Sequence, residues 1–265
     1  MNQGPKTHRR TKIVATVGPG SDSEDMLNRL IAAGVDVFRL NFSHGSAEHH
    51  AEVAVRIRRQ AGYAGRYIGV LADLQGPKIR ISGFAAGSVE ITAGDPFCLD
   101  LDTAHDAGDQ RRVGIEYRAL PEQVVIDDIL LLDDGKLRLR VDDVSERAVD
   151  CTVLIGGQLS SRKGVNKLGG GLAAPALTEK DRSDIAGMAG VDPDFVAVSF
   201  VSSSEDINLA RTLLADVGVS PAIIAKIERA EVVADYDLLD SIIETAEGVM
   251  VARGDLGVEV GDAQL

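Results

Sequence analysis

Cysteine is nearly absent from this sequence, since only Cys98 and Cys151 occur in 265 residues. Each lies in a strand-like apolar run, so we interpret both as small buried side chains in a reducing compartment. Long hydrophobic runs are also absent. No apolar stretch approaches the roughly 20 residues that span a bilayer, and residues 13–17 are too few for a signal-peptide core. We therefore predict a cytoplasmic protein with no membrane partner.

Positive charge is scarce as well. The chain has 28 Lys and Arg against 41 Asp and Glu, a net charge of −13. Such an acidic chain is a poor candidate for binding nucleic acid or anionic membranes. It also repels anionic substrates at long range, so any site for phosphates has to gather its own cations. The composition, 45% hydrophobic and 26% charged, excludes a disordered or low-complexity protein.

Short apolar runs followed by helical spacing repeat along most of the chain. The runs lie at 12–17, 35–42, 67–74, 195–200, 222–228 and 249–253. Helices are predicted after the capping pattern at 21–24, after Ser46, from about Ser203 to Gly218, and from the fifth run to about Ala246. This alternation predicts parallel strands joined by helical crossovers.

The pattern changes between residues 82 and 174. Short alternating segments separated by glycine turns replace the helical spacing, at 88–92, 97–101, 129–132, 137–141 and 151–155. We predict an inserted all-β domain over 82–174, a small barrel, between two α/β parts at 1–81 and 175–265. The α/β parts contain six strands and are shorter than the about 250 residues of a complete (β/α)8 barrel. They form either an open sheet or an incomplete barrel.

Polar side chains follow four of the predicted parallel strands, where α/β folds place their function. These strand ends are the segments 39–45, 73–80, 226–229 and 253–255. They are rich in cations and oxygen ligands and poor in His and Cys, which suits Mg²⁺ and phosphate and argues against zinc. Lys226 and Glu228 alone would be interpreted as a salt bridge, but four such strand ends together indicate a site.

Nine segments of the chain resemble the motifs of the pyruvate kinase family, bacterial type. They are TKIVATVGP (11–19), FRLNFSHG (38–45), DLQGPKIR (73–80), LLDDGK (131–136), SRKGVN (161–166), ALTEKD (176–181), AVSFV (197–201), AKIERAE (225–231) and VMVARGDLGVE (249–259). The resemblance implies a (β/α)8 TIM-type barrel, incomplete with six strands, interrupted after strand three by a β-barrel lid. It also implies the last step of glycolysis, phosphoryl transfer from phosphoenolpyruvate to ADP to give pyruvate and ATP.

The resemblance assigns roles to individual residues. Lys226 resembles the catalytic lysine, and Arg39 the arginine that grips the substrate phosphate. Glu228 and Asp255 resemble the carboxylates that hold Mg²⁺ or Mn²⁺, and the Gly254–Asp255 backbone resembles the cradle for the substrate carboxylate. Three further residues resemble nucleotide-phosphate contacts: His44, Arg80 and Lys163. The family is typically homotetrameric.

The sequence departs from the family pattern in three places. Asn41, Ser43, Asp73 and the Leu74 carbonyl resemble a potassium site, but Lys78 replaces a common glutamate, so we hypothesise that potassium is dispensable. The alternative is that Lys78 points to solvent and potassium is needed. Glycines at 169–171 predict a looser lid hinge. The last two βα units of the family barrel are absent, so we expect the natural protein to continue past Leu265 and these residues alone to be inactive or weakly active.

Two other functions remain open at this point. A non-catalytic remnant that binds Mg²⁺, phosphoenolpyruvate or nucleotide would keep the same residues for regulation or assembly. A barrel lyase or aldolase acting on a pyruvate-like enolate explains Glu228 and Asp255, but it does not explain the inserted domain or the SRKGVN segment.

Overall fold

A computed structural model of the protein describes residues 9–261. Six parallel strands form one sheet in the order β1-β2-β3-β12-β13-β14. The strands are β1 (Val14–Val17), β2 (Val37–Asn41), β3 (Gly69–Asp73), β12 (Phe195–Val198), β13 (Ala222–Ile227) and β14 (Gly248–Val251). Each predicted parallel strand is therefore found, and the sheet follows chain order once the insertion is passed.

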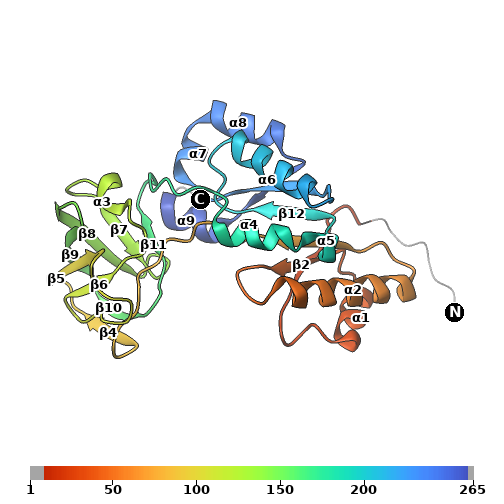
Figure 1. Ribbon diagram of the computed structural model, residues 1–265, viewed down its shortest axis with the longest axis horizontal. Helices are drawn as coiled ribbons and strands as arrows, with labels where there is room; N and C mark the ends of the chain where they lie inside the picture. The colour runs from red at the N-terminus through yellow and green to blue at the C-terminus, as the bar shows by residue number, and fades with distance from the viewer. Residues whose placement is uncertain (1–8, 262–265) are drawn as a thin grey trace.

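Helices connect these strands and cover the sheet (Figure 1). They are α1 (Glu24–Ala33), α2 (Ala47–Ala64), α4 (Glu179–Ala186), α5 (Met188–Val191), α6 (Ser204–Asp216), α7 (Ala230–Ala234), α8 (Tyr236–Thr245) and α9 (Arg253–Val260). The helix predicted after the fifth run is instead two helices, because Asp235 leaves the helical conformation and caps α8 through its side chain. The last strand ends at Val251, so Arg253 already belongs to α9.

Local sequence accounts for the helix ends. The Ser23 side chain accepts a hydrogen bond from the Met26 amide at the start of α1, and Gly34 ends this helix with a φ of 107°. Thr178 and Asp181 form a reciprocal capping box on α4. Along α1, Leu27 and Ile31 are fully buried and face the sheet, as their spacing predicts.

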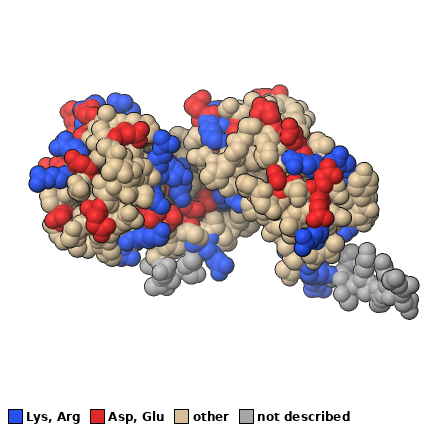
Figure 2. Space-filling view, turned by 90° about the horizontal axis from the view of Figure 1, so that it is seen from below, with Lys and Arg blue, Asp and Glu red and all other residues tan. Residues whose placement is uncertain are grey.

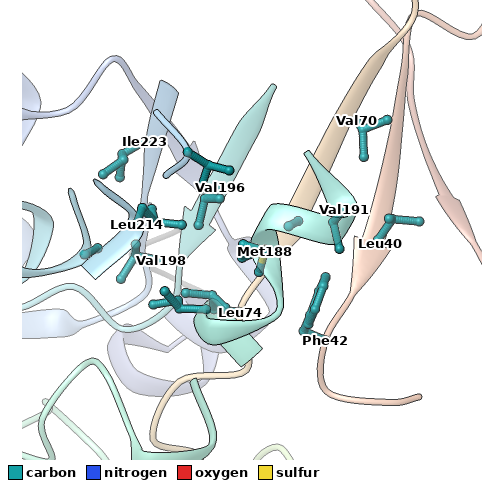
Figure 3. Close-up of a cluster of buried hydrophobic side chains, with 14 of the residues drawn as sticks. Leu40, Phe42, Val70, Leu74, Met188, Val191, Val196, Val198, Leu214 and Ile223 are labelled. Carbon is teal, nitrogen blue, oxygen red and sulfur yellow. The ribbon is translucent and has the colours of Figure 1, made fainter. Parts of the chain in front are cut away.

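One apolar core lies between the parallel sheet and its helices. Figure 3 shows side chains of β2 and β3 beside Met188 and Val191 of α5, and side chains of β12 and β13 beside Leu214 of α6. Phe38, Leu40 and Val196 are at most 1% exposed. This packing fixes the strands, and therefore the loops that leave their carboxyl ends.

The segment between β3 and α4 forms a second unit with its own apolar core. Its elements are β4 (Ser88–Ile91), β5 (Pro96–Asp100), β6 (Arg112–Gly114), α3 (Leu120–Gln123), β7 (Ile129–Leu132), β8 (Leu137–Val144), β9 (Ala148–Ile155), β10 (Gly157–Ser160) and β11 (Val165–Lys167). A six-stranded sheet, β11-β7-β8-β9-β5-β6, lies with the pair β10-β4. We call this unit the inserted domain; its limits at 82 and 174 stay a prediction.

The inserted domain lies at one end of the molecule, and α9 of the α/β part is next to β11 (Figure 1). Acidic and basic side chains meet at the junction of the two lobes (Figure 2). Cys98 and Cys151 are free thiols on strands of this domain. Within residues 9–261, no helix is both long enough and apolar enough to cross a bilayer.

Candidate functional site

The carboxyl ends of four parallel strands lie at one edge of the sheet. Asn41 is in register with Asp73, and Asp73 with Ala197 of the next strand. Val198 is in turn in register with Ala225. Polar side chains that end these strands are therefore brought together, as the sequence pattern predicts.

Lys226 lies at the centre of this group. Its Nζ is 3.0 Å from Glu228 Oε1 and 3.2 Å from Asp73 Oδ1. The same ammonium donates to Ser199 Oγ at 2.8 Å. Glu228 is fully buried and Asp73 is 1% exposed, so two carboxylates share one cation with almost no help from solvent.

Burial and the neighbouring charges shift the pKa values of Lys226 and Glu228. Burial acts most strongly on Lys226 and lowers its pKa, but Glu228 and Asp73 outweigh burial, so the net shift of this pKa is upward. Burial raises the pKa of Glu228, and Lys226 and the Phe200 amide oppose that shift only in part. The ammonium is therefore a fixed positive charge at neutral pH.

Arg39 extends the network from β2. Its Nε donates to Asp73 Oδ2 at 2.5 Å, and an Nη donates to Thr16 Oγ1 at 3.0 Å. The Arg39 side chain is 25% exposed, whereas Asp73 is buried. Asp73 thus lies between a buried ammonium and a guanidinium whose outer face is accessible to a ligand.

These residues line a cavity of about 240 Å³. Of the residues singled out from the sequence, it is lined by Arg39, Asn41, Ser43, His44, Asp73, Leu74, Lys78, Arg80, Lys226, Glu228 and Asp255. They come from segments more than 200 positions apart, and the fold gathers them in one place.

The inserted domain supplies part of the cavity's surroundings. Lys78 Nζ is 3.4 Å from Asp255 Oδ1 and also 3.4 Å from Asp134 Oδ1. Asp134 lies in the turn between β7 and β8, and it has a positive φ of 56°. One ammonium therefore contacts a carboxylate of each lobe.

Two of the residues singled out from the sequence do not line the cavity. Lys163 Nζ is 2.7 Å from Asp133 Oδ1 within the inserted domain. Gly254 lies in the first turn of α9, where amides have no intrahelical acceptor, and open space surrounds the position a Cβ would take.

Ser199 and Arg229 contact the site, and no individual role was predicted for either residue. Ser199 Oγ donates to the Leu74 carbonyl at 2.7 Å while it accepts from Lys226. A serine closing the apolar run 195–200 is the available signal for Ser199. Arg229 follows Glu228 directly and is 4% exposed.

The donor set fits a hard divalent cation. Glu228 and Asp255 both face the same cavity, and Glu228 Oε1 is buried with the Lys226 ammonium 3.0 Å away. Carboxylate oxygens are the ligands Mg²⁺ prefers, with remaining positions left to water and substrate. No group of three or more His, Cys, Asp or Glu side chains arranged to hold a metal occurs within residues 9–261.

Comparisons with known proteins agree with these motifs. A family model described as the pyruvate kinase barrel domain matches residues 8–265. Pyruvate kinase II of Salmonella typhimurium is 52% identical over 257 residues, which cover 97% of this chain and 54% of that protein. Pyruvate kinase of Haemophilus influenzae is 50% identical with the same coverage, and that of Mycobacterium tuberculosis is 41% identical over 252 residues, 95% of this chain and 52% of that protein.

The chain therefore belongs to the pyruvate kinase family, and it spans about half the length of the curated relatives it matches. The family resemblance and the fold class are confirmed: the α/β part is an incomplete (β/α)8 barrel of six strands, interrupted after the third by an all-β domain. The relatives are named as kinases, a class of enzyme.

Helix α2, which follows the loop that carries His44, contains a buried histidine, His50, that generates a pH prediction. His50 Nε2 donates to the His44 carbonyl at 2.8 Å, and its ring packs on Phe42 at 4.3 Å. Burial lowers the pKa of His50. As the pH is lowered from about 7 to about 5, His50 therefore binds a proton more readily in the unfolded chain than in the folded chain. The free energy of unfolding decreases over this range as the pH is lowered.

His50→Gln, which keeps an amide donor, should weaken this loss of stability between about pH 7 and pH 5. The substitution should remove up to about 1.4 kcal/mol of this loss of unfolding free energy for each unit by which burial lowers the pKa of His50. Urea unfolding at both pH values measures it. The matched control is exposed His105→Gln in the inserted domain, which should keep the wild-type dependence. An unchanged dependence in His50→Gln would contradict the assignment.

Proposed function

We propose that this chain carries the phosphoryl-transfer site of a pyruvate kinase, which moves a phosphoryl group from phosphoenolpyruvate to ADP. The observation that carries the proposal is the Lys226 ammonium, held 3.0 and 3.2 Å from two buried carboxylates at the edge of the cavity. The bond from the enol oxygen to phosphorus breaks as a bond to a β-phosphate oxygen of ADP forms. The enolate then takes a proton to give pyruvate.

Lys226 is proposed as the catalytic residue. In a loose transition state the moving phosphoryl group carries negative charge that needs fixed positive charge nearby. Burial makes such a charge more effective than in water, and by analogy with an oxyanion donor its removal costs about 3–4 kcal/mol of transition-state stabilisation. A phosphoryl oxygen replaces one of the three partners of the ammonium when substrate binds.

The other cavity residues are proposed as substrate ligands. Arg39 binds the substrate phosphate with the exposed face of its guanidinium. The first amides of α9, at Gly254 and Asp255, bind the substrate carboxylate. Nucleotide phosphates are assigned to His44, Arg80 and Lys163. Lys163 has to exchange Asp133 for the nucleotide, because the two are 2.7 Å apart.

Glu228 and Asp255 are proposed to hold Mg²⁺ or Mn²⁺. When bound, the ion neutralises phosphate charge and orients the substrate oxygens. The Phe200 amide orients Glu228 by donating to its Oε2 at 2.7 Å. Within residues 9–261, the Asp255 carboxylate has one side-chain contact, with Lys78 at 3.4 Å.

We further propose that Lys78 makes potassium dispensable. Three of the four residues of the candidate potassium site have oxygens that are already engaged: Asp73 by Arg39 and Lys226, Leu74 by Ser199, and Asn41 Oδ1 by the Ser43 amide at 3.1 Å. Lys78 lines the cavity with 27% of its side chain exposed. A fixed ammonium there supplies the charge that a monovalent cation would bring.

Lys226→Met tests the catalytic assignment. The variant should lose phosphoryl transfer by at least about 100-fold, because no other cation replaces the buried charge. Phosphoenolpyruvate binding in the presence of Mn²⁺ should persist, since Arg39 and the α9 amides remain. A coupled assay of pyruvate release measures turnover, and isothermal titration measures binding.

Lys167→Met is the matched control, since Lys167 donates to the Gln123 carbonyl and to Asp128 within the inserted domain and does not line the cavity. It should retain turnover. Near-normal turnover in Lys226→Met would refute the catalytic role. If the wild-type chain binds phosphoenolpyruvate in a divalent-dependent manner but releases no pyruvate, a binding module is the better description of these 265 residues.

Replacing potassium by an inert organic cation tests the role of Lys78. In an active form of the protein the initial rate should change by less than about twofold, because the charge of Lys78 is permanent. Lys78→Glu should make the rate depend on potassium. A large loss of wild-type rate without potassium would contradict the proposal.

A further inference from the structure

Arg229 is buried beside the proposed metal ligand Glu228, and every nitrogen of its guanidinium donates. Nε donates to the Phe200 carbonyl at 2.8 Å, and Nη2 to the Ala174 carbonyl at 2.6 Å. Nη1 donates to the Leu172 carbonyl at 3.2 Å and lies 3.3 Å from Glu231 Oε1. The Arg229 side chain is 5% exposed. The planar guanidinium donates from three nitrogens to three separate carbonyls. A lysine ammonium cannot reproduce this geometry, so lysine is not an equivalent residue here.

Two of these acceptors belong to the chain segment that returns from the inserted domain. We call residues 168–174, between β11 and α4, the return segment. Its glycines 169, 170 and 171 all have positive φ, between 80° and 93°. The φ of 80° at Gly170 favours glycine, and a Cβ there would lie 2.3 Å from Glu231 Oε2, so the Glu231 side chain would have to move. The return segment thus has three consecutive glycines with positive φ, and Arg229 donates to two carbonyls directly after them.

The Phe200 carbonyl, another acceptor of Arg229, belongs to a residue that connects Arg229 to Glu228. The Phe200 amide donates to Glu228 Oε2 at 2.7 Å, while the Phe200 carbonyl accepts from Arg229. Phe200 has a φ of 52°, which is unusual for a large side chain and persists only where neighbours enforce it. Within residues 9–261, the other partner of the Glu228 carboxylate is Lys226. The orientation of its carboxylate therefore depends on where Phe200 is held.

We propose that Arg229 is a positioning residue that holds the proposed metal ligand Glu228 and the base of the return segment as one unit. It sets the affinity for a divalent cation without touching the cation, because it fixes the peptide that orients Glu228. The inference rests on the proposed function, since it takes Glu228 as a metal ligand. Residues that orient metal ligands in this way commonly change metal affinity by about 10–100-fold when replaced.

The test uses Arg229→Lys and Arg229→Gln in the 265-residue chain. Mn²⁺ titration followed by electron paramagnetic resonance should give a dissociation constant raised about tenfold or more in both variants. Without metal, hydrogen exchange should become faster at the Phe200 and Ala174 amides together, while core amides of β12 stay protected. The exchange readout is independent of metal and of turnover.

Arg58→Lys is the matched control. Arg58 also donates to two backbone carbonyls, those of Ile68 and Asp192, and pairs with Asp194 at 2.8 Å. These contacts lie at the opposite ends of the strands, so the control should lower the melting temperature without changing the Mn²⁺ dissociation constant. Wild-type Mn²⁺ affinity in both Arg229 variants, with only a lower melting temperature, would overturn the proposal.

Two further results separate this inference from the proposed function. If the wild-type chain binds no Mn²⁺, the metal assignment fails, and the metal-free exchange of Phe200 and Ala174 still decides the positioning role. If the Arg229 variants do not fold, exchange in the wild-type chain replaces them. Saturating Mn²⁺ should then slow the Phe200 and Ala174 amides together, and slowing of Phe200 alone would overturn the proposal.

Discussion

The site depends on one ammonium group, that of Lys226, shared by two carboxylates that have almost no access to water. Taking three charges out of water is unfavourable, and only close mutual contact offsets that penalty. Lys226 meets Glu228 and Asp73 at 3.0 and 3.2 Å, and Arg39 neutralises the remaining oxygen of Asp73. Removal of Lys226 leaves the buried Glu228 carboxylate without a cationic partner. The group is therefore expected to be rigid, which is the condition for stabilising a transferring phosphoryl group.

The fold meets this condition through strand register. Because β2, β3, β12 and β13 are parallel neighbours, their last residues lie at one edge of the sheet, and the apolar core beneath them prevents slippage. The inserted domain has its own core, so it packs independently and contacts the site through a few polar groups such as Asp134. The proposed catalytic charges thus lie in the α/β lobe, while Lys163, one of the proposed nucleotide contacts, lies in the inserted domain.

Sequence periodicity was sufficient for the parallel strands, most helices and the position of the insertion, because each depends on local spacing. It also placed Lys226 and Glu228 on one face, since residues two apart on a strand share a side. Periodicity carries no information on contacts between distant segments. The Arg229 contacts with Leu172 and Ala174 cross about 55 positions and end on backbone carbonyls, which have no residue signature. For the same reason, periodicity could not predict that Lys163 pairs with Asp133 and does not line the cavity.

A double-mutant cycle of Lys226→Met and Glu228→Gln, measured by the free energy of unfolding, tests the central claim most directly. If the ammonium and the carboxylate stabilise each other in a buried network, the two substitutions should be strongly non-additive, with a coupling energy of about 1 kcal/mol or more. Additivity within about 0.5 kcal/mol would mean that the two groups do not interact in solution and would contradict the account.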